Sequence, residues 1–284
     1  MNPIQASHND PTCDSYRYIR EGVLLWDTST CEAMAQQTVR LVTEDGVYPM
    51  TSWLEPPYLC DPHVVDKVCA VILSLPNNQM YLVSVQRDPS IDPIEVMPPA
   101  LCPVPSVPVD VYELLQRIDT PALRRFVRDV FSLSSVFLPF WQVTAGSHHH
   151  AWPGGLAVHS LDVSLDVVDV MDSPTKRPVH FSRLEYELGM ITALLHDVGK
   201  TVSYNGEGYC TERALVIGHE LLGVELIRKP LDTLRAARAD LADALTALLL
   251  SRTRFSNGRY RLEAIRQVVS KADRESAKRN MKPR

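Results

Sequence analysis

A run of prolines between Pro89 and Pro108 divides the 284-residue chain into two parts of different character. Proline has no amide hydrogen to donate and fixes its own φ angle, so such a run disfavours both strands and helices. We therefore expect residues 91–108 to form an extended, proline-rich linker between two domains. The length of the chain fits this division, since one large or two modest domains are usual at this size.

The part before the prolines shows the alternating pattern of short β-strands. We expect one strand at 22–26, two within 38–54 around an Asp-Gly turn, and two within 67–86 around a Pro-Asn-Asn turn. Strands of this number and length suit a small barrel of the OB type, with another small antiparallel or α+β module as the alternative. Residues 15–90 are therefore predicted to be an OB-like β-barrel, and the order of residues 1–14 is left open.

Helical periodicity replaces the strand pattern after the prolines. Apolar residues recur every three or four positions within 109–118, 121–136, 154–171, 182–199, 211–228, 232–250 and 260–278. Ser182 followed by Glu185 is a capping-box pattern at the start of one of these helices. Apart from a small hairpin near 204–209, residues 109–284 are predicted to be all-α. The whole chain is thus expected to be an α+β protein of two domains.

The composition excludes several classes of protein. Hydrophobic residues make up 45% and charged residues 22% of the chain, which is typical of a core-forming globular protein. No apolar run approaches the ~20 residues of a membrane helix, and the first residues lack the pattern of a signal peptide. We therefore expect a cytoplasmic protein without a membrane partner. The six cysteines form no CxxC pair, which argues against a disulfide framework or a cysteine zinc site.

The net charge of −5 is distributed unevenly. Residues 252–284 contain eleven Lys or Arg and three acidic residues, a local charge of +8 on an otherwise acidic chain. Such a segment indicates either a solvated helix face or contact with an anionic partner or substrate.

The string ALLHDVGK at 193–200 combines several groups suited to catalysis. An apolar helix is expected to carry His196 and Asp197 to the edge of the core, where Gly199 stops the helix. An imidazole and a carboxylate side by side are suitable ligands for zinc, manganese, iron or magnesium ions. Lys200 adds a cation that can hold a phosphate.

Most of the nine histidines lie between His148 and His219. In HHHAWPGGLAVHS, a Pro-Gly-Gly turn opens a helix that brings His159 near the preceding tandem of histidines. A lone histidine on an apolar helix face is usually a core residue. His159 is not alone, because the tandem His148-His149-His150 precedes the turn. Two further candidate ligands lie downstream. They are His219, within an amphipathic helix, and Asp273, near the chain end.

The order His…His-Asp…Asp, with HDxGK and HHxxxGGLxxHS, resembles the HD-domain superfamily of metal-dependent phosphohydrolases over roughly residues 110–280. An OB-like domain, a linker and this HD variant are together most similar to 3′-to-5′ exoribonucleases of the YhaM type. The strings HHAWPGGLAVHS and ADRESAKRN also resemble HD domains of relaxases from conjugative elements. The resemblance implies an HD helical bundle with a divalent metal ion (Mn, Mg, Fe or Zn). The implied metal ligands are His159, His196, Asp197 and Asp273, with Lys200 near the phosphate.

One stretch departs from the exoribonuclease-like pattern. Those members carry a His-His pair after a Leu-Ser, where this chain has Arg252 and Thr253. Because arginine does not ligate a cation, a second metal at His219 lacks its partner histidines, and one metal ion is expected. Either the activity is altered or lost, or Arg252 supplies positive charge in place of the second metal. Arg252 and Arg254 are accordingly candidates for substrate binding, and the basic segment that contains them is expected to face the substrate phosphate.

The expected reaction is metal-assisted hydrolysis of a phosphodiester. Asp197 is expected to ligate the ion and orient water, while Lys200 offsets charge on the phosphate. His149 and His150 are the candidates for contact with the phosphate or for proton transfer to the leaving oxygen.

The expected substrate is single-stranded RNA or DNA, gripped by stacking on exposed aromatic side chains of the barrel. The candidates for stacking are Trp26, Tyr48, Trp53 and Tyr81. One alternative is a phosphohydrolase acting on a small nucleotide, with the barrel as a regulator. The other is a DNA-processing or non-catalytic nucleic-acid-binding protein of a mobile element.

Overall fold

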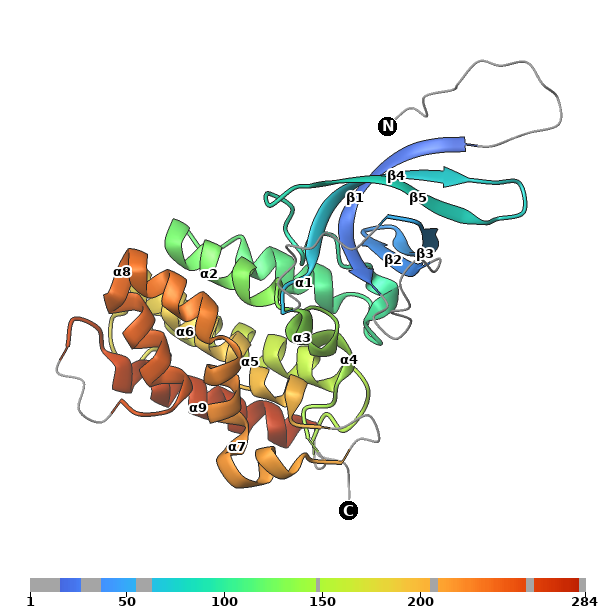
Figure 1. Ribbon diagram of the computed structural model, residues 1–284. Coiled ribbons are helices and arrows are strands. Elements are labelled where there is room, and N and C mark those ends of the chain that lie inside the picture. Colours follow the sequence, from blue (N-terminus) through green and yellow to red (C-terminus); the bar gives the residue numbers. More distant parts are fainter. Residues whose placement is uncertain are drawn as a thin grey trace. The chain divides into compact units, whose positions relative to one another are not determined.

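The computed structural model describes residues 16–26, 37–54, 63–146, 149–204, 209–253 and 258–280 (Figure 1). The chain forms two compact units. The first comprises the chain up to Leu101 together with Ser132–Ser134, and the second comprises Cys102–Phe131 and Ser135–Arg284. The N-terminal segment 1–14 lies outside the described residues. Within the described ranges, no helix combines the length and the apolar character needed to cross a bilayer.

The first unit contains a closed five-stranded barrel. Its strands are β1 (Tyr16–Trp26), β2 (Gln37–Thr43), β3 (Gly46–Ser52), β4 (Asp66–Ser74) and β5 (Met80–Arg87). They follow the order β1-β2-β3-β5-β4, and β1 closes the barrel on β4. Neighbouring strands are antiparallel except β3 and β5, which are parallel. The five predicted strands are confirmed, although β1 begins six residues before the predicted 22–26.

Alternating side chains of these strands form the core of the barrel. The buried members are Leu24, Val39, Leu41, Met50, Val68, Ala70, Ile72 and Leu82. Trp26 and Tyr48 pack against this core, whereas Trp53, just after β3, is 67% exposed. Trp26 and Tyr48, two of the four candidates for stacking on bases, therefore pack against the core of the barrel.

The proline-rich segment differs from the extended linker that its prolines predict. It forms turns and a short 3₁₀ helix, η2 (Pro99–Leu101), and it buries Ile91, Ile94 and Met97. Helix α1 (Val107–Leu115) begins inside the segment, with Pro108 in its first turn. Proline is compatible with turns and with the first turn of a helix, and the apolar residues between the prolines gain by burial.

Helices follow the proline-rich segment. After α1 come α2 (Pro121–Phe131), α3 (Ser134–Phe137), α4 (Pro139–Gln142), α5 (Gly155–Asp172), α6 (Arg183–Leu195), η3 (Val198–Val202), α7 (Glu212–Leu226), α8 (Arg228–Leu249) and α9 (Leu262–Arg279). The predicted helices are confirmed, with four differences. The helix at 121–136 is interrupted after Phe131, and the one at 182–199 ends at Leu195. Non-helical backbone at Gly218 and Arg238 breaks the helices predicted at 211–228 and 232–250. The small hairpin expected near 204–209 is represented by a single bridge between Tyr204 and Cys210. Helix α5 packs against α6 and α9, which lie beside it in Figure 1.

Helix α6 is the central element of the second unit. At its start Ser182 and Glu185 form the predicted capping box, and Glu185 also accepts a hydrogen bond from the backbone of Arg261 at 2.7 Å, just before α9. Every residue from Glu185 to Leu195 is buried. The helix therefore ends inside the unit and presents His196 and Asp197 there.

Candidate metal centre

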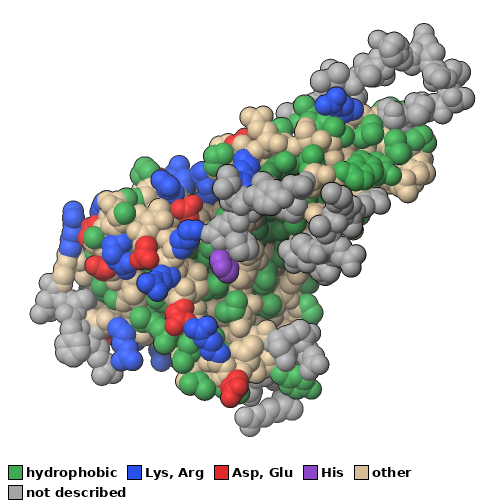
Figure 2. Space-filling view, in the orientation of Figure 1, with side chains coloured by type: hydrophobic (Ala, Val, Ile, Leu, Met, Phe, Trp, Pro, Cys, Tyr) green, Lys and Arg blue, Asp and Glu red, His purple; other side chains and the backbone are tan. Residues whose placement is uncertain are grey.

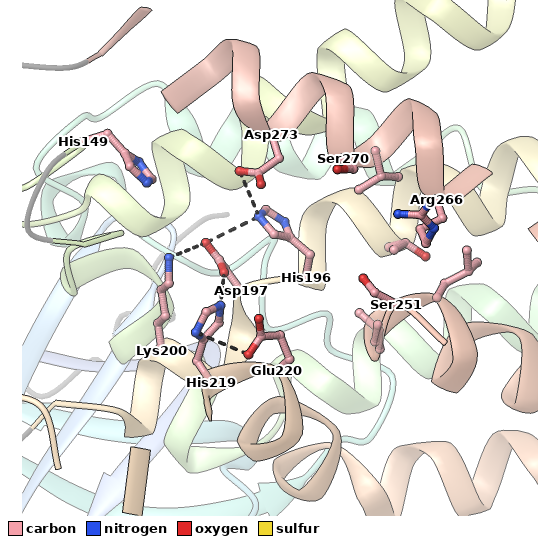
Figure 3. Close-up of a pocket in the computed structure, with 14 residues that line it drawn as sticks. His149, His196, Asp197, Lys200, His219, Glu220, Ser251, Arg266, Ser270 and Asp273 are labelled. Carbon is pink, nitrogen blue, oxygen red and sulfur yellow. Dashed lines mark hydrogen bonds and ion pairs between the residues drawn. The ribbon is translucent and has the colours of Figure 1, made fainter. Parts of the chain in front are cut away.

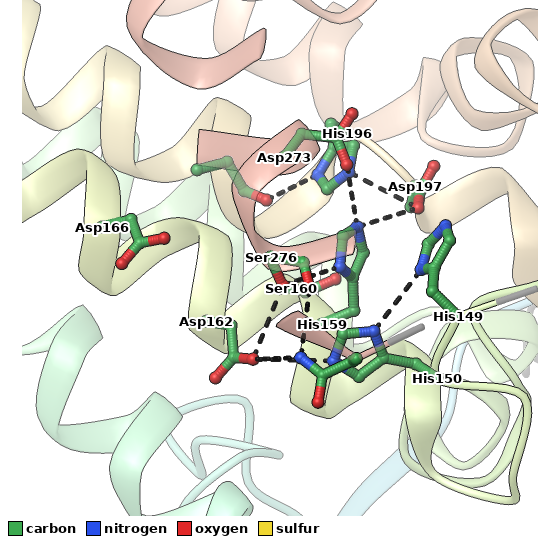
Figure 4. Close-up of polar contacts among 12 residues, drawn as sticks. His149, His150, His159, Ser160, Asp162, Asp166, His196, Asp197, Asp273 and Ser276 are labelled. Atoms are coloured by element: carbon green, nitrogen blue, oxygen red, sulfur yellow. Dashed lines mark hydrogen bonds and ion pairs between the residues drawn. The ribbon is translucent and has the colours of Figure 1, made fainter. Parts of the chain in front are cut away.

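Three helices bring the predicted metal ligands together. His159 lies on α5, His196 and Asp197 follow α6, and Asp273 lies on α9 (Figure 4). The Nε2 atom of His159 is 3.1 Å from Oδ1 of Asp273 and 3.6 Å from Oδ2 of Asp197. The Nε2 atom of His196 is 3.8 Å and 3.4 Å from the same two oxygens. Ligand atoms of His159, His196 and Asp273 all lie within 4.8 Å of one another, so one ion can contact all three.

The other ring nitrogen of each histidine is held by a partner. Nδ1 of His196 donates to the carbonyl of Ala193 at 2.7 Å, and Nδ1 of His159 lies 3.2 Å from Oγ of Ser276. Both Nε2 atoms are buried, and neither has a hydrogen-bond partner among the described residues. Two buried imidazole nitrogens that face the same two carboxylates are arranged as ligands that could hold one metal ion.

Asp197 connects the metal ligands to two cationic groups. Its side chain is 4% exposed. Oδ1 lies 3.0 Å from Nε2 of His219, and Oδ2 accepts a hydrogen bond from Nζ of Lys200 at 2.6 Å. Burial alone would raise the pKa of Asp197, but the opposing effects of His196, His219 and Lys200 are together larger and hold it well below its usual range. Asp197 is therefore a carboxylate, the form that ligates metal ions.

A break in α7 positions His219. Gly218 has φ +79° and ψ 156° inside this helix, a conformation that glycine adopts at little cost. The next residue, His219, lies beside Asp197, and this contact raises the pKa of His219 against the opposing effect of burial. His219 thus supports Asp197. Among the described residues, two groups could hold a metal ion, His159 with His196 and Asp273, and His149 with His150 and His159, and His219 belongs to neither.

Burial is the largest effect on the pKa of His159. It lowers the pKa of His159, and the opposing contact with Asp273 does not reverse this. The pKa of Asp273 is lowered, because contacts with His159 and His196 outweigh the burial that would raise it. The site thus favours neutral imidazole beside ionised carboxylate, which suits metal ligation.

The tandem histidines point in two directions. His149 lines the pocket, whereas His150 is fully buried and directs Nε2 toward Asp162, at 3.5 Å. Their Nδ1 atoms are 3.4 Å apart, and both rings have centroids 5.0 Å from that of His159. Burial lowers the pKa of His149. Of the two predicted catalytic histidines, His149 alone lines this pocket. His148 lies outside the described residues.

Three of the proposed metal ligands, His196, Asp197 and Asp273, line a pocket of about 340 Å³ (Figure 3), and the fully buried His159 lies behind them. The pocket's lining residues are His149, Thr192, His196, Asp197, Lys200, His219, Glu220, Leu248, Leu249, Ser251, Arg266, Val269, Ser270 and Asp273. Arg252 is exposed and does not line the pocket, and Arg254 lies outside the described residues. Arg266 and Ser270, which the motifs do not include, do line it. Their spacing from Asp273 along one helix was the available sequence signal.

The basic segment 252–284 divides between pocket and surface. Arg266 and Asp273 face the pocket. Several other members pair with carboxylates: Arg259 with Asp240, Arg261 with Glu185, Lys278 with Glu275 and Arg279 with Asp166. In Figure 2, Lys and Arg side chains are interspersed with Asp and Glu over the visible face of the helical unit. The local charge of +8 is therefore partly compensated by acidic neighbours.

Comparison with known proteins gives no match: no family model, no curated protein and no solved structure matches the chain.

Proposed function

We propose that the chain is a metal-dependent phosphohydrolase of the HD-domain type. The observation that carries this proposal is the pair of buried Nε2 atoms of His159 and His196, which lie 3.1–3.8 Å from the carboxylate oxygens of Asp197 and Asp273. The HDxGK string supplies Lys200 beside the same carboxylates.

The residues present fit a divalent ion. Two imidazole nitrogens and two carboxylates form a mixed nitrogen and oxygen donor set, which suits manganese, iron or zinc better than calcium. His159 and His196 would hold the ion through Nε2, and Asp197 and Asp273 through carboxylate oxygens. When bound, the ion supplies positive charge that acidifies water and polarises a phosphoryl oxygen.

The surrounding side chains have distinct roles in this proposal. Lys200 lines the pocket next to Asp197, where its ammonium group can bind a phosphate oxygen. Asp197 orients water by accepting a hydrogen bond. His149 stands on the same pocket wall with its pKa lowered by burial, and its ring is placed to exchange a proton with the leaving oxygen.

We propose single-stranded nucleic acid as the substrate and an OB-type role for the barrel. The strand order β1-β2-β3-β5-β4, closed by β1 on β4, supports the OB assignment. Trp53 stacks on Tyr81 with ring centroids 5.0 Å apart and planes inclined by 2°. Because Trp53 remains 67% exposed, its free face can stack on a base.

The size of the pocket also fits a second candidate, hydrolysis of a small nucleotide. A volume of about 340 Å³ is near the lower end of small-molecule sites, which span roughly 300–1,000 Å³. Such a pocket holds a single nucleotide unit, whether free or at the end of a strand.

Metal analysis combined with a phosphodiesterase assay tests the proposal. The wild type, reconstituted with Mn²⁺ and desalted, is expected to retain about one ion per chain and to hydrolyse bis-p-nitrophenyl phosphate. His196→Ala and Asp273→Ala should lose both the ion and the activity, because each removes one proposed ligand. His180→Ala, which changes an exposed histidine of the same unit, is the matched control. Retention of no metal by the wild type would refute the proposal.

A further inference from the structure

The pocket extends beyond the metal centre to a second cation, Arg266, which the proposed reaction does not use. Arg266, Val269, Ser270 and Asp273 lie on one face of α9, and all four line the pocket. Seven helical residues rise by about 10.5 Å, so Arg266 lies about two turns from Asp273. In Figure 3, Arg266 lies on the opposite side of the pocket from Lys200.

Arg266 is held in place by a network of hydrogen bonds. Its Nε and Nη2 donate to the two carboxylate oxygens of Glu263 at 2.9 and 2.6 Å. Glu263 also accepts from Oγ1 of Thr253 at 2.6 Å and from Gln267 at 3.0 Å. Thr253 is 1% exposed, so the network is anchored in the interior.

This anchoring prepares Arg266 to bind an anion. The two hydrogen bonds to Glu263 leave Nη1 without an acceptor among the described residues. A guanidinium group that is already oriented loses little conformational freedom when it binds phosphate oxygens.

Three apolar side chains line part of this otherwise polar pocket. Leu248 and Leu249, at the end of α8, line the pocket together with Val269. Ser251 and Ser270 add hydroxyl groups on the side of Arg266 (Figure 3). Ser251 has a φ of +53°, and such a left-handed conformation of a non-glycine residue is often found at functional sites. Two cations on opposite sides, with these apolar side chains and hydroxyl groups in the same pocket, suit a nucleoside that carries two phosphates.

Building on the proposed function, we propose that the pocket binds a nucleoside flanked by two phosphates. One phosphate lies at the metal centre beside Lys200, the nucleoside packs against Leu248, Leu249 and Val269, and the second phosphate binds Arg266. Two sources present this chemistry: a nucleotide unit within a single strand and a free nucleoside bisphosphate. The common requirement is a second phosphate one nucleoside away from the one that reacts.

Calorimetric titration of the full-length, Mn²⁺-loaded protein tests this requirement. The probes are thymidine 3′,5′-bisphosphate and the 3′- and 5′-monophosphates, each checked by chromatography to be intact afterwards. We expect the bisphosphate to bind at least tenfold more tightly than either monophosphate. Arg266→Met should abolish this preference. Arg235→Met is the matched control, because Arg235 pairs with Asp232 three residues earlier at 2.6 Å, as Arg266 does with Glu263, yet lies outside the pocket.

The outcomes separate this inference from the proposed function. Equal binding of bisphosphate and monophosphates by the wild type, or an unchanged preference in Arg266→Met, would overturn the inference while leaving the metal centre intact. Failure of the wild type to retain Mn²⁺ refutes the proposed function instead. If Arg266→Met itself loses Mn²⁺, Arg266→Lys decides: a preference reduced at least threefold supports the inference, and an unchanged one overturns it.

A hexathymidylate strand distinguishes the two sources. If the second phosphate belongs to a strand, the hexanucleotide should bind more tightly than the bisphosphate, and Arg266→Met should weaken both. If it belongs to a free nucleotide, the substitution should weaken the bisphosphate alone.

Discussion

At the scale of residues, each proposed metal ligand depends on a partner that fixes its orientation. Oγ of Ser276 contacts Nδ1 of His159, and the carbonyl of Ala193 accepts a hydrogen bond from Nδ1 of His196. These contacts set which nitrogen of each ring faces the carboxylates. The ligands were identifiable from their motifs, whereas Ser276 belongs to no motif and is near His159 only because α9 packs on α5.

Ser276→Ala is expected to weaken metal binding without removing a ligand. Loss of such a supporting contact typically reduces metal affinity by about 10- to 100-fold. Competition with a chromogenic chelator measures the affinity of each variant for Mn²⁺. Ser164→Ala is the matched control, because Ser164 is also fully buried but donates to the carbonyl of Ser160 within α5. Equal affinities for the two variants would contradict the role assigned to Ser276.

The stability of the fold is expected to depend on the ionisation of Glu263. Hydrogen bonds from Arg266, then from Thr253 and Gln267, lower the pKa of Glu263 to about 2. Because this pKa lies below the unfolded value of about 4.3, the charged carboxylate stabilises the fold above pH ~4.3, and this contribution is lost as the pH falls toward about 2.

Glu263→Gln should therefore unfold at lower urea than the wild type near neutral pH, and the two midpoints should converge as the pH approaches about 2. Urea unfolding over this range measures the difference. A difference that stays constant with pH would contradict the assigned role.

At the scale of elements, the end of α6 depends on close contact between η3 and α7. A Cβ atom on Gly199 would lie 1.9 Å from the carbonyl oxygen of His219 and 2.5 Å from the amide nitrogen of Gly223. The sequence indicated that the helix stops near this glycine. The sequence did not indicate that Gly199 allows the backbone of α7 to approach closely, because this contact joins residues distant in the chain.

Gly199→Ala is expected to destabilise the helical unit and to disturb the metal centre together. Such overpacking typically costs about 1–3 kcal/mol, here against backbone atoms that have little room to move. Thermal unfolding and retained Mn²⁺ measure the two effects. Gly146→Ala is the control, since no atom lies within 4 Å of its added Cβ. A Gly199→Ala protein with unchanged stability and metal content would contradict the packing described here.

At the scale of the whole molecule, the two units carry different parts of the proposed function. The proposed metal ligands all belong to the helical unit, and the exposed stack of Trp53 on Tyr81 belongs to the barrel. Binding of a strand and retention of metal should therefore respond to different substitutions.

Trp53→Ala should weaken binding of a single-stranded oligonucleotide by about 1–3 kcal/mol for each base that stacks, and leave the Mn²⁺ content unchanged. Fluorescence anisotropy of a labelled hexathymidylate, measured at several salt concentrations, gives the affinity. Tyr16→Ala is the matched control, because Tyr16 is 57% exposed on the same barrel and forms no described ring stack. Equal affinities of the two variants would remove the barrel stack from the proposal.

Local patterns in the sequence determined the elements and the chemistry of the ligands. Period-two and helical repeats encode strands and helices through neighbouring residues, and HDxGK places His196, Asp197 and Lys200 within five positions. The tertiary structure decided which side chains meet. Arg266, rather than Arg252, lines the pocket, and His150 turns to Asp162 instead of the pocket. The proline-rich segment is compact because its apolar residues are buried. These outcomes depend on packing between distant segments, which no short stretch of sequence encodes.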